Sequence, residues 1–205
     1  MTDPTPPPGM QRLEQAEQLK LAGQYREAII ILEQLLEEDP GNVTALEEIA
    51  DNELSLEAYE RAETAAQQAI QLDSKSYTGE YILGFVRSHE GEWDDAVAHL
   101  KRANKLKPNN GEILRCLGWA MFHQGHRPEG VVTLERALNL DHENALTLCD
   151  LGVAYVELRN LKKAKALFGR AIELDPANDR ARECVAAIER LERGVSTNGQ
   201  RKVKG

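Results

Sequence analysis

The chain is poor in cysteine and in aromatic residues: 3 of its 205 residues are cysteine, and Phe, Trp and Tyr make up 5%. The three cysteines lack CxxC spacing, which excludes a disulfide framework and favours a reducing compartment. No segment approaches the roughly eighteen apolar residues of a membrane span. The first residues, MTDPTPPPG, have neither the basic start nor the apolar run of a secretory signal. We therefore expect a cytoplasmic protein without a membrane span.

Catalytic signatures are also missing from the sequence. There is no Gly-rich phosphate loop, no Gly-x-Ser-x-Gly elbow and no HExxH helix. His89 and His123 recur after 34 residues, and Cys116, Cys149 and Cys184 after 33 and 35. Packed helices stand about 8 to 10 Å apart, whereas metal ligands must converge to about 2 to 2.3 Å from the ion. Small, semi-buried thiols are the commoner outcome, so we expect no enzyme, no metal and no cofactor.

Positive charge is scarce in the first part of the chain. Residues 1–76 contain five Lys or Arg against sixteen Asp or Glu, whereas residues 77–205 contain twenty against eighteen. Nucleic-acid binding depends on Lys and Arg contacts to phosphates, so this imbalance argues against a nucleic-acid ligand. A basic protein or peptide would be steered toward such a field.

What the sequence does have is a repeated unit, most complete in residues 145–178. Apolar residues recur there at steps of three and four, first in Leu148, Leu151, Ala154, Tyr155 and Leu158, and then in Ala164, Leu167, Phe168, Ala171 and Leu174. This spacing predicts two amphipathic helices. Pro176 ends the second helix because proline lacks the amide that a further turn needs.

The same pattern returns at a period of 34 residues, in ranges 9–42, 43–76, 77–110 and 111–144. A small residue, an aromatic, two alanines and a proline at this period resemble the tetratricopeptide repeat family, in its bacterial type. The resemblance implies an all-α fold: a right-handed superhelical α-solenoid of five helix-turn-helix units over residues 9–193. The first helix of each unit would line the inner wall, and we call these the A-type helices.

Some units depart from the pattern. Gly130 stands where the second helix of a unit normally carries Ala, and His142 and Ser74 stand where Pro is usual. The repeat boundaries are for this reason placed only to within a few residues, while the fold class is unaffected.

The two ends of the chain differ from the repeats. Residues 179–193 predict an amphipathic helix that covers the last apolar face, as a capping helix does in repeat proteins. We expect residues 1–8 to form a Pro-rich disordered tail and residues 194–205 to form a disordered basic tail.

The clearest candidate binding residues are apolar side chains that the repeat pattern does not need. They are Tyr81, Ile82 and Phe85 in one A-type helix, and Trp119 and Phe122 in the next, with Arg115 beside them. Aromatic anchors on a sheltered wall are typical of binding hot spots. The alternative is that these side chains pack against each other or across adjacent units.

Glu47, Glu48 and Asp51 crowd one turn of the second unit, where like charges repel unless a cation lies nearby. They are candidates to receive basic residues of a partner. The alternative interpretation is a solvated acidic surface.

One known subclass of the family binds acidic chaperone tails with Lys, Asn, Asn, Lys and Arg on three successive A-type helices. The matching positions here, counted from the first unit, are Leu13, Glu17, Glu48, Thr78 and Ile82. Counting from later units does not restore the basic set, so we expect no binding of this kind.

The sequence therefore predicts a non-enzymatic adaptor that holds a peptide or helix of a partner, basic and apolar in character, in its concave groove. Its apolar anchors would be Tyr81, Phe85, Trp119 and Phe122. The alternative is a self-assembling scaffold in which the aromatic wall is a homo-oligomer interface. Either a monomer or a weak homo-oligomer fits the pattern.

Overall fold

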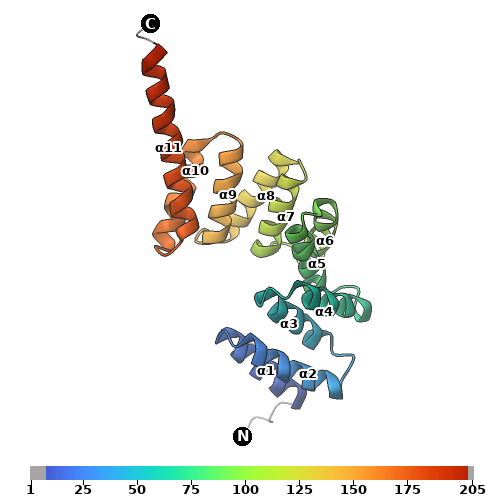
Figure 1. The fold of residues 1–205 in the computed structure, drawn as a ribbon. Coiled ribbons are helices and arrows are strands. Elements are labelled where there is room, and N and C mark those ends of the chain that lie inside the picture. Colours follow the sequence, from blue (N-terminus) through green and yellow to red (C-terminus); the bar gives the residue numbers. More distant parts are fainter. Residues whose placement is uncertain (1–7, 203–205) are drawn as a thin grey trace. The chain divides into compact units, whose positions relative to one another are not determined.

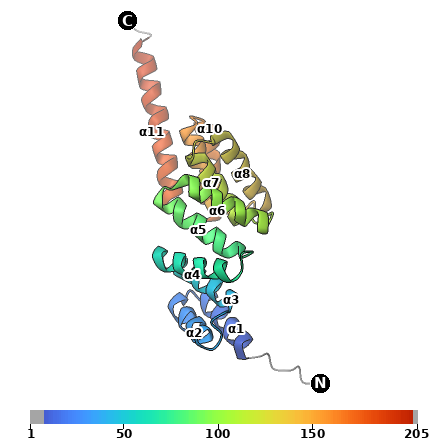
Figure 2. The ribbon, with the colours of Figure 1, turned by 90° about the vertical axis from the view of Figure 1, so that its right-hand side faces the viewer.

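The computed structural model describes the backbone of residues 8–202 and the side chains of residues 9–193. Eleven helices and no strand occur in this described part, which confirms the all-α class. The chain divides into two compact units, residues 1–108 and residues 109–205, each of which contains more than one of the 34-residue repeats. From here on, the first unit and the second unit are these two parts of the chain. Figures 1 and 2 show the helices of each unit in two views at right angles.

The first unit holds three helix pairs. Helix α1 (Pro8–Leu21) packs against α2 (Tyr25–Glu38), α3 (Val43–Ser55) against α4 (Tyr59–Leu72), and α5 (Tyr77–Glu90) against α6 (Trp93–Leu106). Successive pairs are joined by contacts of α2 with α3 and of α4 with α5, and α3 also contacts α5. The core of this unit runs through α1 to α5 and is rich in alanine.

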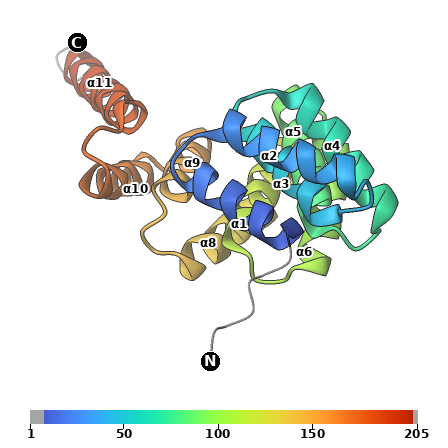
Figure 3. The same ribbon diagram turned by 90° about the horizontal axis from the view of Figure 1, so that it is seen from below.

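The second unit holds two helix pairs and a final long helix. Helix α7 (Gly111–His123) packs against α8 (Arg127–Leu140), and α9 (Ala145–Glu157) against α10 (Leu161–Leu174). Helix α11 (Asp179–Lys202) packs against α10 and extends past it (Figure 1), and Figure 3 shows the same helices from below. Ala181 and Ile188 of α11 are buried in the core of this unit.

The predicted tails need correction at their inner edges. The backbone of residues 194–202, expected to be disordered, continues α11, because no proline interrupts its amide-to-carbonyl bonds. At the other end Pro8 already belongs to α1, where proline is well tolerated as a first residue. Residues 1–7 and 203–205 lie outside the described part, so the tail predictions for them stay predictions.

Each A-type helix after the first, and also helix α11, is started by the same device. A side-chain oxygen just before the helix accepts a hydrogen bond from the backbone amide three residues later, which satisfies one of the amides that a helix leaves unpaired at its start. The capping residues are spaced at 34: Asn42, Ser76, Asn110, Asn144 and Asn178.

The turn inside each helix pair is also repeated. Gly23, Glu57, Gly91, Gly125 and Arg159 all have positive φ, between 58° and 104°. The amide after each of them bonds to a carbonyl five residues back, as Asn160 N does to Tyr155 O at 2.8 Å. This closure ends the A-type helix and reverses the chain. Left-handed backbone strains residues with a Cβ, so the turns at Glu57 and Arg159 are less favourable than those at glycine.

Small residues decide how closely the helices of a pair approach. Ala28, Ala62, Ala96 and Ala164, at corresponding places in α2, α4, α6 and α10, are all fully buried. Across from them lie Gly84 in α5 and Gly152 in α9, where a Cβ would meet Leu100 at 2.5 Å and the Phe168 ring at 2.7 Å. The pairs are therefore packed too tightly at these points for any larger residue.

Candidate functional site

On helix α5, apolar side chains face both inward and outward. Ile82 and Val86 are buried in the core of the first unit, whereas Tyr81 and Phe85 are half-buried. The rings of Tyr81 and Phe85 lie 6.4 Å apart between centroids at an interplanar angle of 56°. Tyr81 and Phe85 thus keep apolar surface open, but Ile82 has none. The expectation that Ile82 contacts a partner is wrong, because its side chain fills the core.

Helix α7 gives a similar division in the second unit. Trp119 is half-buried, with its ring 4.3 Å from that of His123. Phe122 is 1% exposed and belongs to the core with Leu134 and Leu151. The prediction of Phe122 as an exposed anchor is therefore also wrong, since the side chain points into the space between the helices of this unit.

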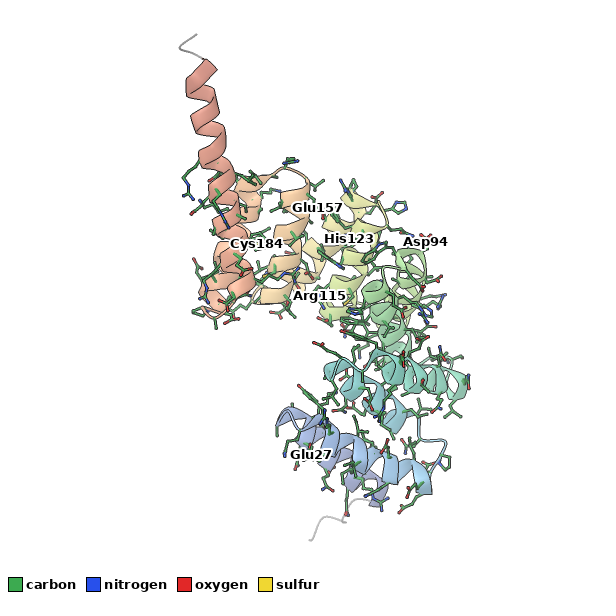
Figure 4. All side chains as sticks on the ribbon, viewed as in Figure 1. Glu27, Asp94, Arg115, His123, Glu157 and Cys184 are labelled. Atoms are coloured by element: carbon green, nitrogen blue, oxygen red, sulfur yellow. The ribbon has the colours of Figure 1, made fainter. Side chains whose placement is uncertain are left out.

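Arg115 was expected on the same wall, but its guanidinium is engaged within the chain. Nη1 lies 2.7 Å from Oδ2 of Asp150 on α9, and Nη2 donates to Glu112 one turn back (Figure 4 labels Arg115). The Arg115 and Asp150 side chains are 13% and 11% exposed. Burial raises the pKa of Asp150, although Arg115 acts in the opposite direction. Arg115 thus joins α7 to α9 and offers a partner little.

The acidic cluster of α3 receives its cation from the chain itself. Nζ of Lys20 on α1 lies 3.0 Å from Oε2 of Glu48 and 2.5 Å from Oδ2 of Asp51. Ser76 Oγ donates to Glu47 Oε1 at 2.6 Å, and burial raises the pKa of Glu47. Sequence reasoning missed Lys20 in this role. The signal was available, because residues 1–76 contain few cations that could neutralise these carboxylates.

The first unit brings most of the predicted residues to two neighbouring helices. Helices α3 and α5 are in contact, and Asp51 and Phe85 occupy corresponding places, the ninth residue of each. An acidic turn and an aromatic pair therefore lie on adjacent helices. We take Glu48, Asp51, Tyr81 and Phe85 as the candidate binding face of this unit, with Trp119 as a separate anchor on the second unit.

Residues for metal or thiol chemistry are not brought together. No group of three His, Cys, Asp or Glu side chains within residues 9–193 could hold a metal ion. All three cysteines are free thiols, and burial raises the pKa of Cys149 and of Cys184. A raised pKa leaves less thiolate at neutral pH, which makes these thiols poor nucleophiles. None of the described helices combines the length and apolarity that crossing a membrane requires.

Comparison with known proteins supports a repeat fold. Sequence profiles described as tetratricopeptide repeat match residues 13–77 and 145–178. A stretch of 61 residues is 34% identical to anaphase-promoting complex subunit 3 of Schizosaccharomyces pombe. That stretch covers 30% of this chain and only 9% of the yeast protein.

Solved structures resemble this chain over most of its length. TTC0263, a thermophilic tetratricopeptide repeat protein of Thermus thermophilus, has a TM-score of 0.71 at 21% identity, covering 88% of this chain and 98% of that one. Cut9, in its anaphase-promoting complex assembly with Hcn1, gives 0.82 at 18%, covering 90% and 37%. YrrB, described as having an unusual peptide-binding site, gives 0.61 at 22%, covering 84% and 89%. At these identities the likeness shows the fold alone.

Proposed function

Because this chain belongs to the tetratricopeptide repeat family, we propose that it is a non-enzymatic scaffold that binds a peptide or helix of a partner protein. The family generally mediates protein–protein interaction. The finer proposal is that the candidate binding face of α3 and α5 is the docking surface.

The observation that carries this proposal is the half-buried aromatic pair of α5. Tyr81 and Phe85 stay half-buried although α5 already buries Ile82, Leu83 and Val86, and Tyr81 packs against that core with part of its surface. Large rings with few rotatable bonds lose little entropy on binding, and they dominate many interfaces. Trp119 supplies the same kind of anchor on the second unit.

Charge defines the character of the partner. Residues 1–76 carry a net charge of −11, and Lys20 neutralises only part of the charge of Glu48 and Asp51. A basic residue beside an apolar one would match the acidic turn and the rings on adjacent helices. That a fold of this kind can hold a peptide or a protein is illustrated by YrrB, described as having a peptide-binding site, and by Cut9, found in complex with Hcn1.

The test is affinity capture from the source cell with the native chain, with Phe85→Ala and with Trp119→Ala, each at low and high salt. Tyr25→Ala is the matched control, because Tyr25 is also a half-buried aromatic but lies on α2. Loss of an anchor ring should weaken binding by about 2 kcal/mol or more, roughly thirtyfold in Kd.

A protein retained by the native chain and by Tyr25→Ala, but lost with Phe85→Ala, supports docking on this face. Sensitivity to salt would show the contribution of the acidic turn. Equal loss with Tyr25→Ala, or no loss with Phe85→Ala, contradicts the proposal. Recovery of the chain alone, with a dimer in sedimentation that Phe85→Ala abolishes, would instead favour the self-assembling scaffold.

A further inference from the structure

A cavity of about 360 Å³ lies in the first unit, on a side of α3 that the proposed docking face does not use. It is open to solvent on one side and is lined by residues of α2, of the end of α3 with the turn after it, and of the start of α4. Its lining combines two carboxylates, two guanidinium groups and apolar side chains: Glu33, Glu53, Arg26, Arg61, Ile29, Ile30, Leu56 and Ala58.

Equivalent helices carry different side chains at the position of Glu53. Glu53 is the eleventh residue of α3, and Tyr155 is the eleventh residue of α9. Both helices end in the same turn, at Glu57 and Arg159 respectively. In α9 Tyr155 is 9% exposed, and its hydroxyl donates to Glu135 Oε1 at 2.8 Å and accepts from Lys163 Nζ at 3.1 Å. At this position α3 has a carboxylate, whereas α9 has the larger ring of a tyrosine.

The Glu53 carboxylate is buried with incomplete pairing. Glu53 is 1% exposed, and its Oε1 accepts no hydrogen bond from any described residue. Nη2 of Arg61 lies 2.5 Å from this atom and 3.6 Å from Oε1 of Glu33. Burial raises the pKa of Glu53 in spite of Arg61. One guanidinium is therefore shared by two carboxylates, and the buried one still lacks a properly directed donor.

Arg61 also shows what kind of group fits this position. Its side chain is 65% exposed, so the guanidinium reaches Glu53 from the solvent side and can leave without uncovering the core. Ile30 is 53% exposed on α2, although it lines the cavity together with Leu56. The methylene stem of a long basic side chain buries well against such apolar surface while its charge lies beyond it.

We propose that this cavity binds a lysine or arginine side chain of a partner protein, with its cation on Glu53 and Glu33 and its stem along Ile30 and Leu56. The net charge of −11 over residues 1–76 favours a cation over an anionic ligand. A cation bound there would pair with the buried oxygen of Glu53 in place of Arg61, and charge-assisted hydrogen bonds are the strong ones. This site is independent of the candidate binding face, so either can fail without the other.

The experiment is an NMR titration of the full chain labelled at its isoleucine δ-methyl groups. The probes are N-acetyl-arginine amide and N-acetyl-lysine amide, with N-acetyl-citrulline amide as the uncharged control. Glu53→Gln removes the charge at nearly constant size. Glu60→Gln removes one carboxylate from the exposed surface of α4 and is the matched control.

We expect the basic probes to shift the Ile29 and Ile30 methyl resonances, and the citrulline probe to leave them unchanged. Glu53→Gln should weaken the binding by about tenfold, since a hydrogen bond to a charged group is lost. Glu60→Gln should change it by less than about twofold, because exposed charges are well screened.

Arg61→Ala gives a second, opposite test. Removing the guanidinium that now occupies the carboxylates should tighten binding of the arginine probe. Thermal melting followed by circular dichroism shows that each variant is folded. The proposal is overturned if the basic probes shift neither methyl in native chain or Arg61→Ala, or if Glu53→Gln binds them as Glu60→Gln does.

Discussion

The backbones of α7 and α8 meet at Gly118 and Gly130: a Cβ added to Gly130 would lie 2.7 Å from the carbonyl oxygen of Gly118. The same atom would also lie 2.7 Å from the amide nitrogen of Phe122. Neither contact can relax by a side-chain movement, because both partners are backbone atoms. The glycine that departs from the repeat pattern is therefore required by the contact between these two helices.

Gly130→Ala should lower the free energy of unfolding by about 1 to 3 kcal/mol through overpacking, although alanine is the better helix former. Gly169→Ala is the matched control, because nothing lies within 4 Å of a Cβ at this position in α10. It should raise stability by about 0.5 to 1 kcal/mol. Urea unfolding measures both, and a stabilised Gly130→Ala would contradict the close approach.

The repeated turn makes a second prediction. Gly91 has φ 80° with open space around its Cα, so Gly91→Ala should lower stability by about 1 kcal/mol through backbone strain alone. Glu57 has φ 58° at the corresponding place, so Glu57→Gly should raise stability by about 0.5 kcal/mol. Glu60→Gly, in the first turn of α4, should lower it by up to about 1 kcal/mol, because glycine is a poor helix former and the carboxylate at the helix start is lost. Equal losses at positions 57 and 60 would argue against strain in the turn.

The buried ion pair between α7 and α9 is the third test. Arg115→Met leaves the buried Asp150 carboxylate without its guanidinium, and should lower stability by about 3 kcal/mol. Arg170→Met removes an arginine that is half-exposed in its ion pair with Glu173, and should change stability by less than about 1 kcal/mol. Adding Asp150→Leu to Arg115→Met should recover much of the loss. Similar losses for Arg115→Met and Arg170→Met would mean that the buried pair contributes no more than the surface pair.

Glu53 gives a prediction about pH. Its pKa is raised in the folded chain above the value of an unfolded glutamate, about 4.3. Between these two pKa values the native state holds a proton on Glu53 that the unfolded state has lost. Stability of the native chain therefore falls as pH rises through this window. Glu53→Gln has no carboxyl group at this position and therefore lacks this loss. Its stability should match that of the native chain near pH 4, which is about the pKa of an unfolded glutamate, and exceed it at neutral pH. Urea unfolding across this range measures the difference, and Glu60→Gln, which keeps Glu53, should lose stability with rising pH as the native chain does.

Much of the fold could be predicted from the sequence because one pattern is repeated along the chain. The spacing of Leu151, Ala154 and Tyr155 predicts helices, and the 34-residue period predicts the neighbours that cover them. The capping residues were an unused signal: Asn or Ser recurs at this period from Asn42 to Asn178, with a side chain suited to starting a helix. The continuation of α11 to Lys202 was missed because polar composition does not by itself stop a helix.

The candidate site was harder to predict because burial depends on where neighbouring helices lie. The side chains of Ile82 and Phe122 are as apolar as those of Tyr81 and Trp119, but they point from their helices in other directions. A small rotation of the helix decides which of them enters the core. The pairing of Arg115 with Asp150 likewise depends on the contact of α7 with α9. The sequence did offer a signal for Glu53, because a charged residue stands at the position where α9 has Tyr155.

The pattern of helix contacts also bears on how the chain reaches its native state. In the described structure each helix packs mainly on the helices next to it in sequence, as α1 does on α2 and α10 on α11. Such contacts require only short loops to close, and proteins rich in them fold in microseconds to milliseconds. A helix pair can form beside one already in place, so growth from neighbour to neighbour, rather than a single distant nucleus, is the expected folding route.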